Sequence, residues 1–299
     1  MKWIRPRPKQ VAKPVRPPLS LAAPQLQLAI TAFVIPVILL LWRKWQRKSA
    51  VLRDRLVLRA LFKATGGDDW EEEAQRGWKE EEADLSGWHG VEVDARGRVV
   101  KLDKSSSGLT NTIPPELGLL GQLEEVCLTE NELSGLPKEL GQLSQLRVLK
   151  LGANQLQKLP RSIGQLTQLS HIHLTDNTLS SLPDEIGQLE ALTELDLSCN
   201  QLQVWSEGLW QLRQLTALDV SYNPLKEPTS GLWRMSQLRK LSMESTGLSR
   251  LPEEIGRLGQ LRELSLSYNK LRALPKGLGQ LKQLMKLDLS NNQLEEFPR

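Results

Sequence analysis

The stretch that decides the fold is "LRVLKLGANQLQKLPRSIGQLTQ" at residues 146–168, because the 23 residues after it, "LSHIHLTDNTLSSLPDEIGQLEA" at 169–191, repeat its pattern. The shared pattern is L-x-x-L-x-L-x-x-N-x-L-x-x-L-P-x-x-I-G-x-L-x-x. Copies begin at Leu123, Leu146, Leu169, Leu192, Leu215, Leu238 and Leu261, after a 24-residue variant at 99–122 and before a clipped copy at 284–299. Such a period indicates a solenoid in which each repeat is one turn, called a rung below.

The spacing within a rung predicts which side chains enter the core. Leu149 and Leu151 are two residues apart, so both point to one side of a short strand, while Val148 and Lys150 point to the other. Further apolar residues return along the arc, and only stacking of rungs can bury them. We therefore expect an α/β solenoid, a horseshoe with a parallel concave β-sheet, over residues 99–299, with eight full rungs and a partial ninth.

Asparagine recurs where the chain leaves each strand. Its amide both donates and accepts, so we expect it to satisfy backbone groups in a buried turn. Thr246 takes the asparagine position in one rung, and we expect a weak point there. The glycine of each "IG" or "LG" step is expected to permit a tight convex turn. The asparagine positions are Asn131, Asn154, Asn177, Asn200, Asn223 and Asn269.

The positive charge of the chain is concentrated at its start. Residues 1–53 contain eleven Lys/Arg and no Asp or Glu, whereas residues 54–299 contain 28 Lys/Arg and 35 Asp/Glu, a net charge of −7. The sequence pI of about 9.0 therefore reflects the N-terminal segment. It gives no support for nucleic-acid binding by the repeats.

The N-terminal segment predicts a membrane anchor. Residues 1–18 form a basic, proline-rich tail, and residues 19–42 are uncharged, with the apolar run "LQLAITAFVIPVILLLW" at 26–42. As a helix this run reaches about 25 Å, the short end for a membrane span. Flanking Lys and Arg, with Trp42 and Trp45, fit a transmembrane helix at 19–42. An organelle transit peptide and an interfacial helix kinked at Pro36 are the alternatives.

Charge and cysteine usage give an expected location. More basic residues lie close to the C-terminal side of the anchor, which favours cytoplasmic repeats. Cys127 and Cys199 are three rungs apart, roughly 14 Å and too far for a disulfide, so both should be free thiols. None of the nine asparagines begins an N-x-S/T sequon. We expect a single-pass membrane protein with cytoplasmic repeats.

Residues 43–98 are expected to form a juxtamembrane basic segment and a tryptophan-rich cap. A helix capped by Ser49 should end near Ala64, before two glycines. Three tryptophans follow at positions 70, 78 and 88, and "ARG" at 95–97 predicts a hairpin turn. The cap would cover the apolar end of the first rung.

The segments "ALFKATGGDDW" (60–70), "GWHGVEVDARGRVV" (87–100) and "SGLTNTIPPELGLL" (107–120) resemble the N-terminal cap and first repeat of leucine-rich-repeat proteins from algae, bacteria and plants. The later "LPxxIGxL" rungs resemble those of Ras-suppressor and scribble-type scaffolds and of plant intracellular relatives. The resemblance covers residues 60–299 and implies a fold and no specific function. Val93 occupies the position of a cysteine in extracellular plant caps, so their disulfide is not implied and tryptophans must hold this cap.

Outward-pointing strand residues predict a partner-binding surface on the concave face. Glu194, Asp196 and Asp219 fall on two consecutive rungs that contribute no basic residue, and two tyrosines lie at the same strand edge. Tyrosine beside charge is a common interface composition. We expect a protein partner, basic or of mixed charge, although solvated surface residues would show the same pattern. The predicted surface comprises Glu194, Asp196, Asp219, Tyr222, Glu244, Glu263, Tyr268, His171 and His173.

Two smaller features have alternative interpretations. His171 and His173 share a strand and lie one rung from two carboxylates, a donor set that zinc can use, but the repeat leaves these positions free and we predict no metal site. Trp205, Trp210 and Trp233 lie in the irregular rungs at 192–237. They either pack the arc or form a convex hydrophobic patch for a partner or membrane.

The sequence contains no P-loop, kinase signature, G-x-S-x-G, H-E-x-x-H or C-x-x-C motif. We predict a non-enzymatic, membrane-anchored protein-interaction module that needs no cofactor, nucleic acid or small-molecule substrate. Its role as a scaffold or regulator in signalling or defence rests on family analogy. One alternative is the receptor part of a larger leucine-rich-repeat receptor or kinase, cut short at Arg299. The other is an organelle-targeted soluble repeat protein with a cleaved leader.

Overall fold

The computed structural model describes residues 35–80 and 84–295, with side-chain surroundings from residue 48 onward. The chain divides into two units, Met1–Ser49 and Ala50–Arg299. The predicted tail at 1–18 and most of the predicted anchor at 19–42 lie outside the described residues. Among the described helices, none is both long and apolar enough to cross a membrane.

The second unit is built on one long sheet. Its strands are β1 (Val91–Val93), β2 (Val99–Asp103), β4 (Glu125–Cys127), β6 (Val148–Lys150), β7 (His171–His173), β8 (Glu194–Asp196), β9 (Ala217–Asp219), β10 (Lys240–Ser242), β11 (Glu263–Ser265) and β12 (Lys286–Asp288). They pair in this order, all in parallel except for the antiparallel pair β1–β2. Two further strands, β3 (Thr110–Thr112) and β5 (Glu132–Gly135), form a small parallel sheet of their own.

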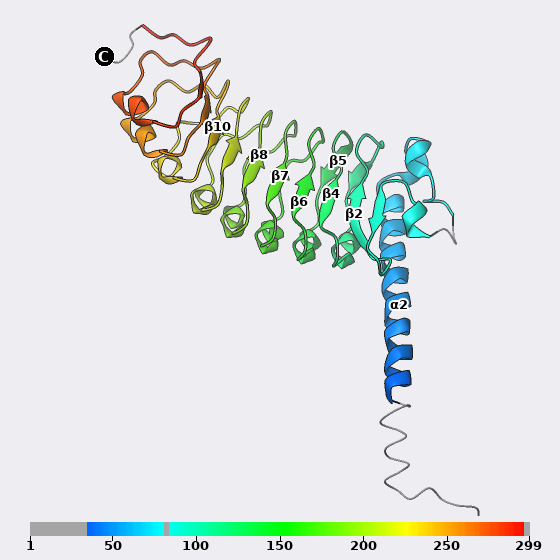
Figure 1. The fold of residues 1–299 in the computed structure, drawn as a ribbon. Coiled ribbons are helices and arrows are strands. Elements are labelled where there is room, and N and C mark those ends of the chain that lie inside the picture. Colours follow the sequence, from blue (N-terminus) through cyan, green and yellow to red (C-terminus); the bar gives the residue numbers. More distant parts are fainter. Residues whose placement is uncertain (1–34, 81–83, 296–299) are drawn as a thin grey trace, which may run out of the picture. The chain divides into compact units, whose positions relative to one another are not determined.

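One long helix and many short ones complete the described chain. The α-helix is α2 (Ile35–Ala64). The 3₁₀ helices are η2 (Gly67–Asp69), η3 (Glu73–Gln75), η4 (Leu85–Gly87), η5 (Pro115–Leu119), η6 (Lys138–Gln142), η7 (Arg161–Gln165), η8 (Asp184–Gln188), η9 (Glu207–Gln211), η10 (Leu232–Arg234), η11 (Glu253–Arg257) and η12 (Lys276–Gln280). In the solenoid, the strands stand side by side and η5 to η12 follow the opposite side (Figure 1).

The two-residue alternation of each strand confirms the predicted core. Leu149 is 1% exposed and Leu151 is fully buried, whereas Val148 and Lys150 are half-buried on the other face. The leucines of successive rungs form one continuous hydrophobic core from the cap to the last rungs. The α/β solenoid with a parallel sheet, expected from the repeat, is therefore confirmed.

The predicted asparagine ladder is present and links each rung to the one before it. The Oδ1 atom of Asn177 accepts a hydrogen bond from the Leu156 N–H at 2.9 Å. Its Nδ2 atom donates to the Leu151 carbonyl of the preceding rung at 2.9 Å and to the Leu174 carbonyl of its own rung at 3.2 Å. The same arrangement recurs at the other ladder positions, including Asn292 in the clipped copy.

Thr246 breaks this ladder, as the sequence predicted. Its hydroxyl donates to the Met243 carbonyl of its own rung at 3.2 Å and supplies no bond to the preceding rung. The Leu225 N–H would donate to the side-chain oxygen of an asparagine at position 246. It donates instead to the Asn223 carbonyl at 2.8 Å. The rungs that begin at Leu215 and Leu238 therefore lack the asparagine bonds that join the other pairs, although the side chains of Ser221 and Glu227 still link them.

Replacing Asn177 with alanine should lower the free energy of unfolding by about 3 kcal/mol, because two carbonyls and one N–H lose buried partners. Thr246→Asn should raise it by about 1 kcal/mol by restoring the missing bonds. Denaturant unfolding followed by circular dichroism measures both. The exposed Gln201→Ala serves as control, and a loss for Asn177→Ala no larger than for this control would contradict the ladder's role.

The glycines of the "IG" steps act differently from our expectation. None of them has a positive φ, the left-handed backbone conformation, although some other described glycines do. A Cβ atom at Gly187 would lie 2.7 Å from the Gly208 carbonyl oxygen of the next rung, and Gly141 and Gly164 meet equally close carbonyls. Glycine is therefore required by the close approach of adjacent rungs rather than by a tight turn.

The cap begins on α2, where the prediction for Ser49 was wrong: this residue lies inside the helix and does not cap it. The predicted end at Ala64 and the predicted hairpin between β1 and β2 are confirmed. Asp54 of α2 is fully buried and accepts hydrogen bonds from Arg98 at 2.7 and 3.0 Å and from the Val99 N–H at 3.2 Å. This buried ion pair fixes α2 to the hairpin that starts the sheet.

Aromatic rings fill the cap, as the absence of a disulfide required. The ring centroids of Trp70 and Trp78 lie 5.0 Å apart, and those of Trp78 and Trp88 lie 5.1 Å apart. Lys104, at the position where later rungs place a leucine, is fully buried, with Nζ 4.7 Å from each of the first two rings. It donates to the Ala74 and His89 carbonyls, which ties the first rung to the cap.

Burial lowers the pKa of Lys104 to about 7 from 10.5. Above pH 7 the unfolded chain therefore binds more protons than the folded chain. The free energy of unfolding should rise with pH by at most about 1.4 kcal/mol per pH unit. Lys104→Met should remove this rise. Denaturant unfolding of both proteins between pH 7 and 8 tests it, because above this range the unfolded Cys127 thiol begins to ionise while burial raises its pKa in the folded protein, which acts in the opposite sense. If the free energy of unfolding changed with pH equally in the two proteins, Lys104 would not be the cause of the rise.

Candidate functional site

The concave face is formed by the outward side chains of β2 to β12, and its charges are distributed unevenly. In the first rungs, Glu92 and Glu125 have basic partners. Lys101 Nζ lies 3.5 Å from Glu92 and 3.7 Å from Glu125, and Lys150 Nζ lies 4.0 Å from Glu125. The Glu125 carboxylate raises the pKa of Lys101. The Glu125 charge is thus neutralised by side chains of its own rung's neighbours.

The predicted histidine pair lies next to Glu194. The Nε2 atoms of His171 and His173 are 3.8 and 3.7 Å from the two carboxylate oxygens of Glu194 on the neighbouring strand. No set of three or more potential metal ligands is arranged to hold an ion in the part of the chain that the structure describes. The three residues therefore form a local polar cluster.

Four carboxylates on the middle and later rungs lack a basic partner. We call Asp176, Asp196, Asp219 and Glu244 the acidic strip. Asp196 and Asp219 are aligned on adjacent strands, and burial together with the Asp196 charge raises the pKa of Asp219. None of the described Lys, Arg or His side chains forms an ion pair with the strip, in contrast to Glu125 and Glu194.

Sequence reasoning missed Asp176 and Cys199, which complete this surface. Cys199 is exposed, and burial of its thiol and the charges of Asp176, Asp196 and Asp219 raise its pKa. Both missed residues directly precede a ladder asparagine, in the same column as Tyr222 and Tyr268. Comparing this column across rungs would have revealed them.

The column has an unusual backbone requirement. Every residue in it adopts a positive φ, between 48° and 56° from Ser106 to Tyr268. Large side chains rarely adopt this conformation, which asparagine and glycine tolerate best. Tyr222 and Tyr268 nevertheless occupy it, with 49% and 58% of their surface exposed. Burial, with smaller effects of Glu244 and Tyr268, raises the pKa of the Tyr222 hydroxyl, and the Tyr222 N–H donates to the Glu244 carbonyl at 2.7 Å, which places these two residues side by side.

Glu263 differs from the rest of the predicted set. Its carboxylate lies 2.9 Å from Lys286 Nζ, and this hydrogen bond and charge lower its pKa. The structure therefore brings Asp196, Asp219, Glu244 and the two tyrosines together, places Glu194 with the histidines, and pairs Glu263 with the last rung.

The predicted convex tryptophan patch is wrong for Trp233, which is 2% exposed and belongs to the core. Trp205 and Trp210 are half-buried, with ring centroids 5.5 Å apart, and Trp205 Nε1 donates to the Lys226 carbonyl at 2.8 Å. A Cβ atom at Gly231 would collide with the Trp210 ring. These tryptophans therefore fill the space between irregular rungs, which is the packing interpretation.

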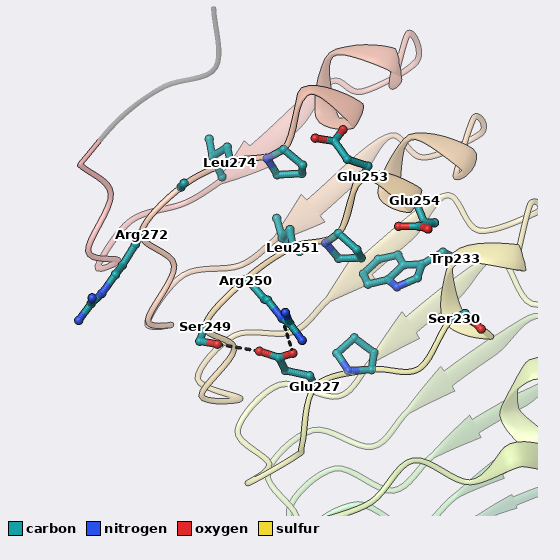
Figure 2. Close-up of a pocket in the computed structure, with 14 residues that line it drawn as sticks. Glu227, Ser230, Trp233, Ser249, Arg250, Leu251, Glu253, Glu254, Arg272 and Leu274 are labelled. Carbon is teal, nitrogen blue, oxygen red and sulfur yellow. Dashed lines mark hydrogen bonds and ion pairs between the residues drawn. The ribbon is translucent and has the colours of Figure 1, made fainter.

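A hollow of about 660 Å³ lies beside Trp233 on the side of the "LP" steps. Pro228, which replaces a leucine of the repeat, lines it together with the Leu251–Pro252 and Leu274–Pro275 steps of the next two rungs. Figure 2 shows Glu227 joined to Ser249 and Arg250, each at 2.7 Å. Glu227 and Arg250 thus neutralise each other at this rim, whereas the acidic strip has no basic partner.

Comparison with protein families identifies the chain. A model described as a leucine-rich repeat region matches residues 96–229 and 225–298. The chain therefore belongs to the leucine-rich-repeat proteins. No curated protein matches it.

Solved structures of plant proteins share the fold. The ectodomain of the Arabidopsis receptor kinase HAESA, in complex with a peptide hormone, is 26% identical, with a TM-score of 0.69, over 83% of this chain and 42% of that one. The plant peptide hormone receptor RGFR1, in complex with RGF2, is 29% identical, with a TM-score of 0.56, over 62% and 31%. A plant ice-binding protein, 24% identical with a TM-score of 0.59 over 80% and 86%, shows the fold alone. The chain thus spans less than half of these receptor chains.

Proposed function

We propose that this protein is an interaction module whose concave face holds an extended, basic segment of a partner protein. The acidic strip and Tyr222 and Tyr268 make the contact. The observation that carries the proposal is the contrast within one face. The Glu125 carboxylate of the first rungs is neutralised by neighbouring lysines, whereas the carboxylates of the strip have no basic partner, and exposed tyrosines lie beside them.

The chemistry of the partner follows from this contrast. Lys or Arg side chains would neutralise the strip and could also lie over the tyrosine rings. The sheet is already formed, so binding costs little ordering of the protein itself. Two of the similar receptor ectodomains bind peptides, as described above. An extended segment that crosses successive strands is therefore the geometry we favour.

We further propose that residues 19–42 hold the module in a membrane, with the repeats facing the cytoplasm, where it serves as a scaffold or regulator. The uncharged N-terminal run, the free thiols of Cys127 and Cys199 and the absence of sequons support this placement. A receptor part of a larger protein is the second candidate. It is favoured by the similarity to receptor ectodomains, of which this chain spans less than half.

A lysine–serine repeat peptide should bind the full-length protein, and Asp196→Asn with Asp219→Asn should weaken binding by more than tenfold, because two charge-assisted contacts are lost. Fluorescence anisotropy of the labelled peptide measures this. Asparagine keeps the shape of aspartate, so folding should be unaffected.

Matched controls separate the strip from overall charge. Glu124→Gln with Glu130→Gln removes two exposed carboxylates from the first rungs and should leave affinity nearly unchanged. Tyr222→Asn should weaken binding without loss of stability, since asparagine suits the positive φ at this position. Equal effects of the two carboxylate pairs would reject the strip as the binding surface.

The membrane proposal predicts that the full-length chain, tagged at its C-terminus, stays in the pellet after carbonate extraction, because a spanning helix leaves the bilayer only with detergent. Protease added outside intact vesicles whose cytosolic face points outward should digest the tag. A soluble chain that has lost its first residues would instead identify a cleaved leader. A protected tag would place the repeats on the far side of the membrane.

A further inference from the structure

The positive-φ column of the concave face places one small residue between two exposed aromatic residues. Tyr222, Ser245 and Tyr268 occupy this column on three successive rungs, with φ of 56°, 50° and 53°. Backbone bonds hold these rungs side by side: the Tyr222 N–H donates to the Glu244 carbonyl at 2.7 Å. The Ser245 N–H donates in the same way to the Ser267 carbonyl at 3.0 Å. Serine is the shortest of the three side chains, so the column is lowest between the two tyrosines, which we call the tyrosine pair.

The spacing of the tyrosine pair suits one side chain of a partner. At ~4.8 Å per strand, the Cα atoms of Tyr222 and Tyr268 are about 10 Å apart. A cation midway between the two residues would lie about 5 Å from each, within the ~6 Å over which an aromatic ring attracts a cation. A planar group in contact with a ring on both sides needs about 7–8 Å between the rings, and small movements of exposed tyrosine side chains supply this.

The tyrosines stand at positions that disfavour them. A large side chain at a positive φ strains the backbone, whereas Asn291, in the same column at a φ of 55°, is a residue type that suits it. Both tyrosines are about half exposed, so burial in the core does not offset this strain. Strain that the fold itself does not require indicates a functional role for the side chains.

A carboxylate lies next to the pair. Glu244 directly precedes Ser245, is half-buried, and forms no ion pair with the described basic side chains. The guanidinium group of arginine is planar and weakly hydrated, stacks on aromatic rings and bonds a carboxylate through two N–H groups. The lysine ammonium is compact and strongly hydrated, and it gains less from such a setting.

We propose that the tyrosine pair selects arginine over lysine in the basic segment held by the concave face. One arginine side chain lies between Tyr222 and Tyr268, over Ser245, and its guanidinium group bonds the Glu244 carboxylate. This inference rests on the proposed function and adds which basic residue the segment carries at this point. The carboxylates of Asp196 and Asp219 attract either cation, so the preference comes from the pair.

Two labelled peptides of equal length, an arginine–serine repeat and a lysine–serine repeat, test this by fluorescence anisotropy with the full-length protein. The arginine peptide should bind about fivefold more tightly. Tyr222→Asn with Tyr268→Asn should bring this ratio close to one, because asparagine suits the positive φ and removes the rings. Tyr222→Phe with Tyr268→Phe keeps the rings and should keep the ratio.

A larger residue between intact tyrosines gives a second test. Ser245→Asn should also bring the ratio close to one, because its side chain occupies the place of the guanidinium group. Ala153→Asn is the matched control: it lies in the same column of an earlier rung, at a φ of 49°, and should leave the ratio unchanged.

Equal binding of the two peptides by the wild-type protein, or a ratio that survives loss of both rings, would overturn the pair as the selector. Such a failure is distinct from failure of the concave site. Asp196→Asn with Asp219→Asn would still weaken both peptides if the acidic strip binds the segment, and absence of binding by either peptide would reject the site and the selector together.

Discussion

The structure depends on how a buried turn satisfies its backbone. At the end of each strand the chain turns inward, and its N–H and C=O groups lose access to water. Asn177 and its counterparts supply one acceptor and two donors at the same place in each rung that carries them, with a bond to the rung before. This fixes the spacing of the rungs, so the strands meet in register and the leucines form one core. The same spacing places the outward side chains of successive strands at regular intervals on the concave face.

The close contact between rungs imposes a second constraint. Only glycine fits at positions 141, 164 and 187, because neighbouring carbonyl groups occupy the space that a Cβ atom would need. The irregular rungs solve the same problem with tryptophan, where Trp210 packs over Gly231. In these rungs, the large side chain of Trp210 fits because the adjacent rung has a glycine, Gly231, at the point of contact.

The sequence predicts the fold well because the repeat reports the same constraint eight times. It predicts the cap less completely. The spacing of the tryptophans indicated an aromatic cluster, but nothing local marked Lys104 as the residue that reaches into it from a leucine position. The pattern left Trp233 open between the core and a surface patch, because repeat register fixes where a residue lies along the rung, while burial depends on how the shortened η10 packs. Which concave carboxylates have basic partners also depends on side-chain positions in adjacent rungs, which the pattern cannot give.

The break at Thr246 has a mechanical consequence. In a solenoid each rung contacts only its neighbours, so the stiffness of the whole depends on its weakest junction. The junction without asparagine bonds lies between the rung carrying Tyr222 and the rung that precedes Tyr268. The two tyrosines therefore stand on opposite sides of a joint. A segment that contacts both tyrosines would therefore bridge the one junction that the asparagines leave unlinked.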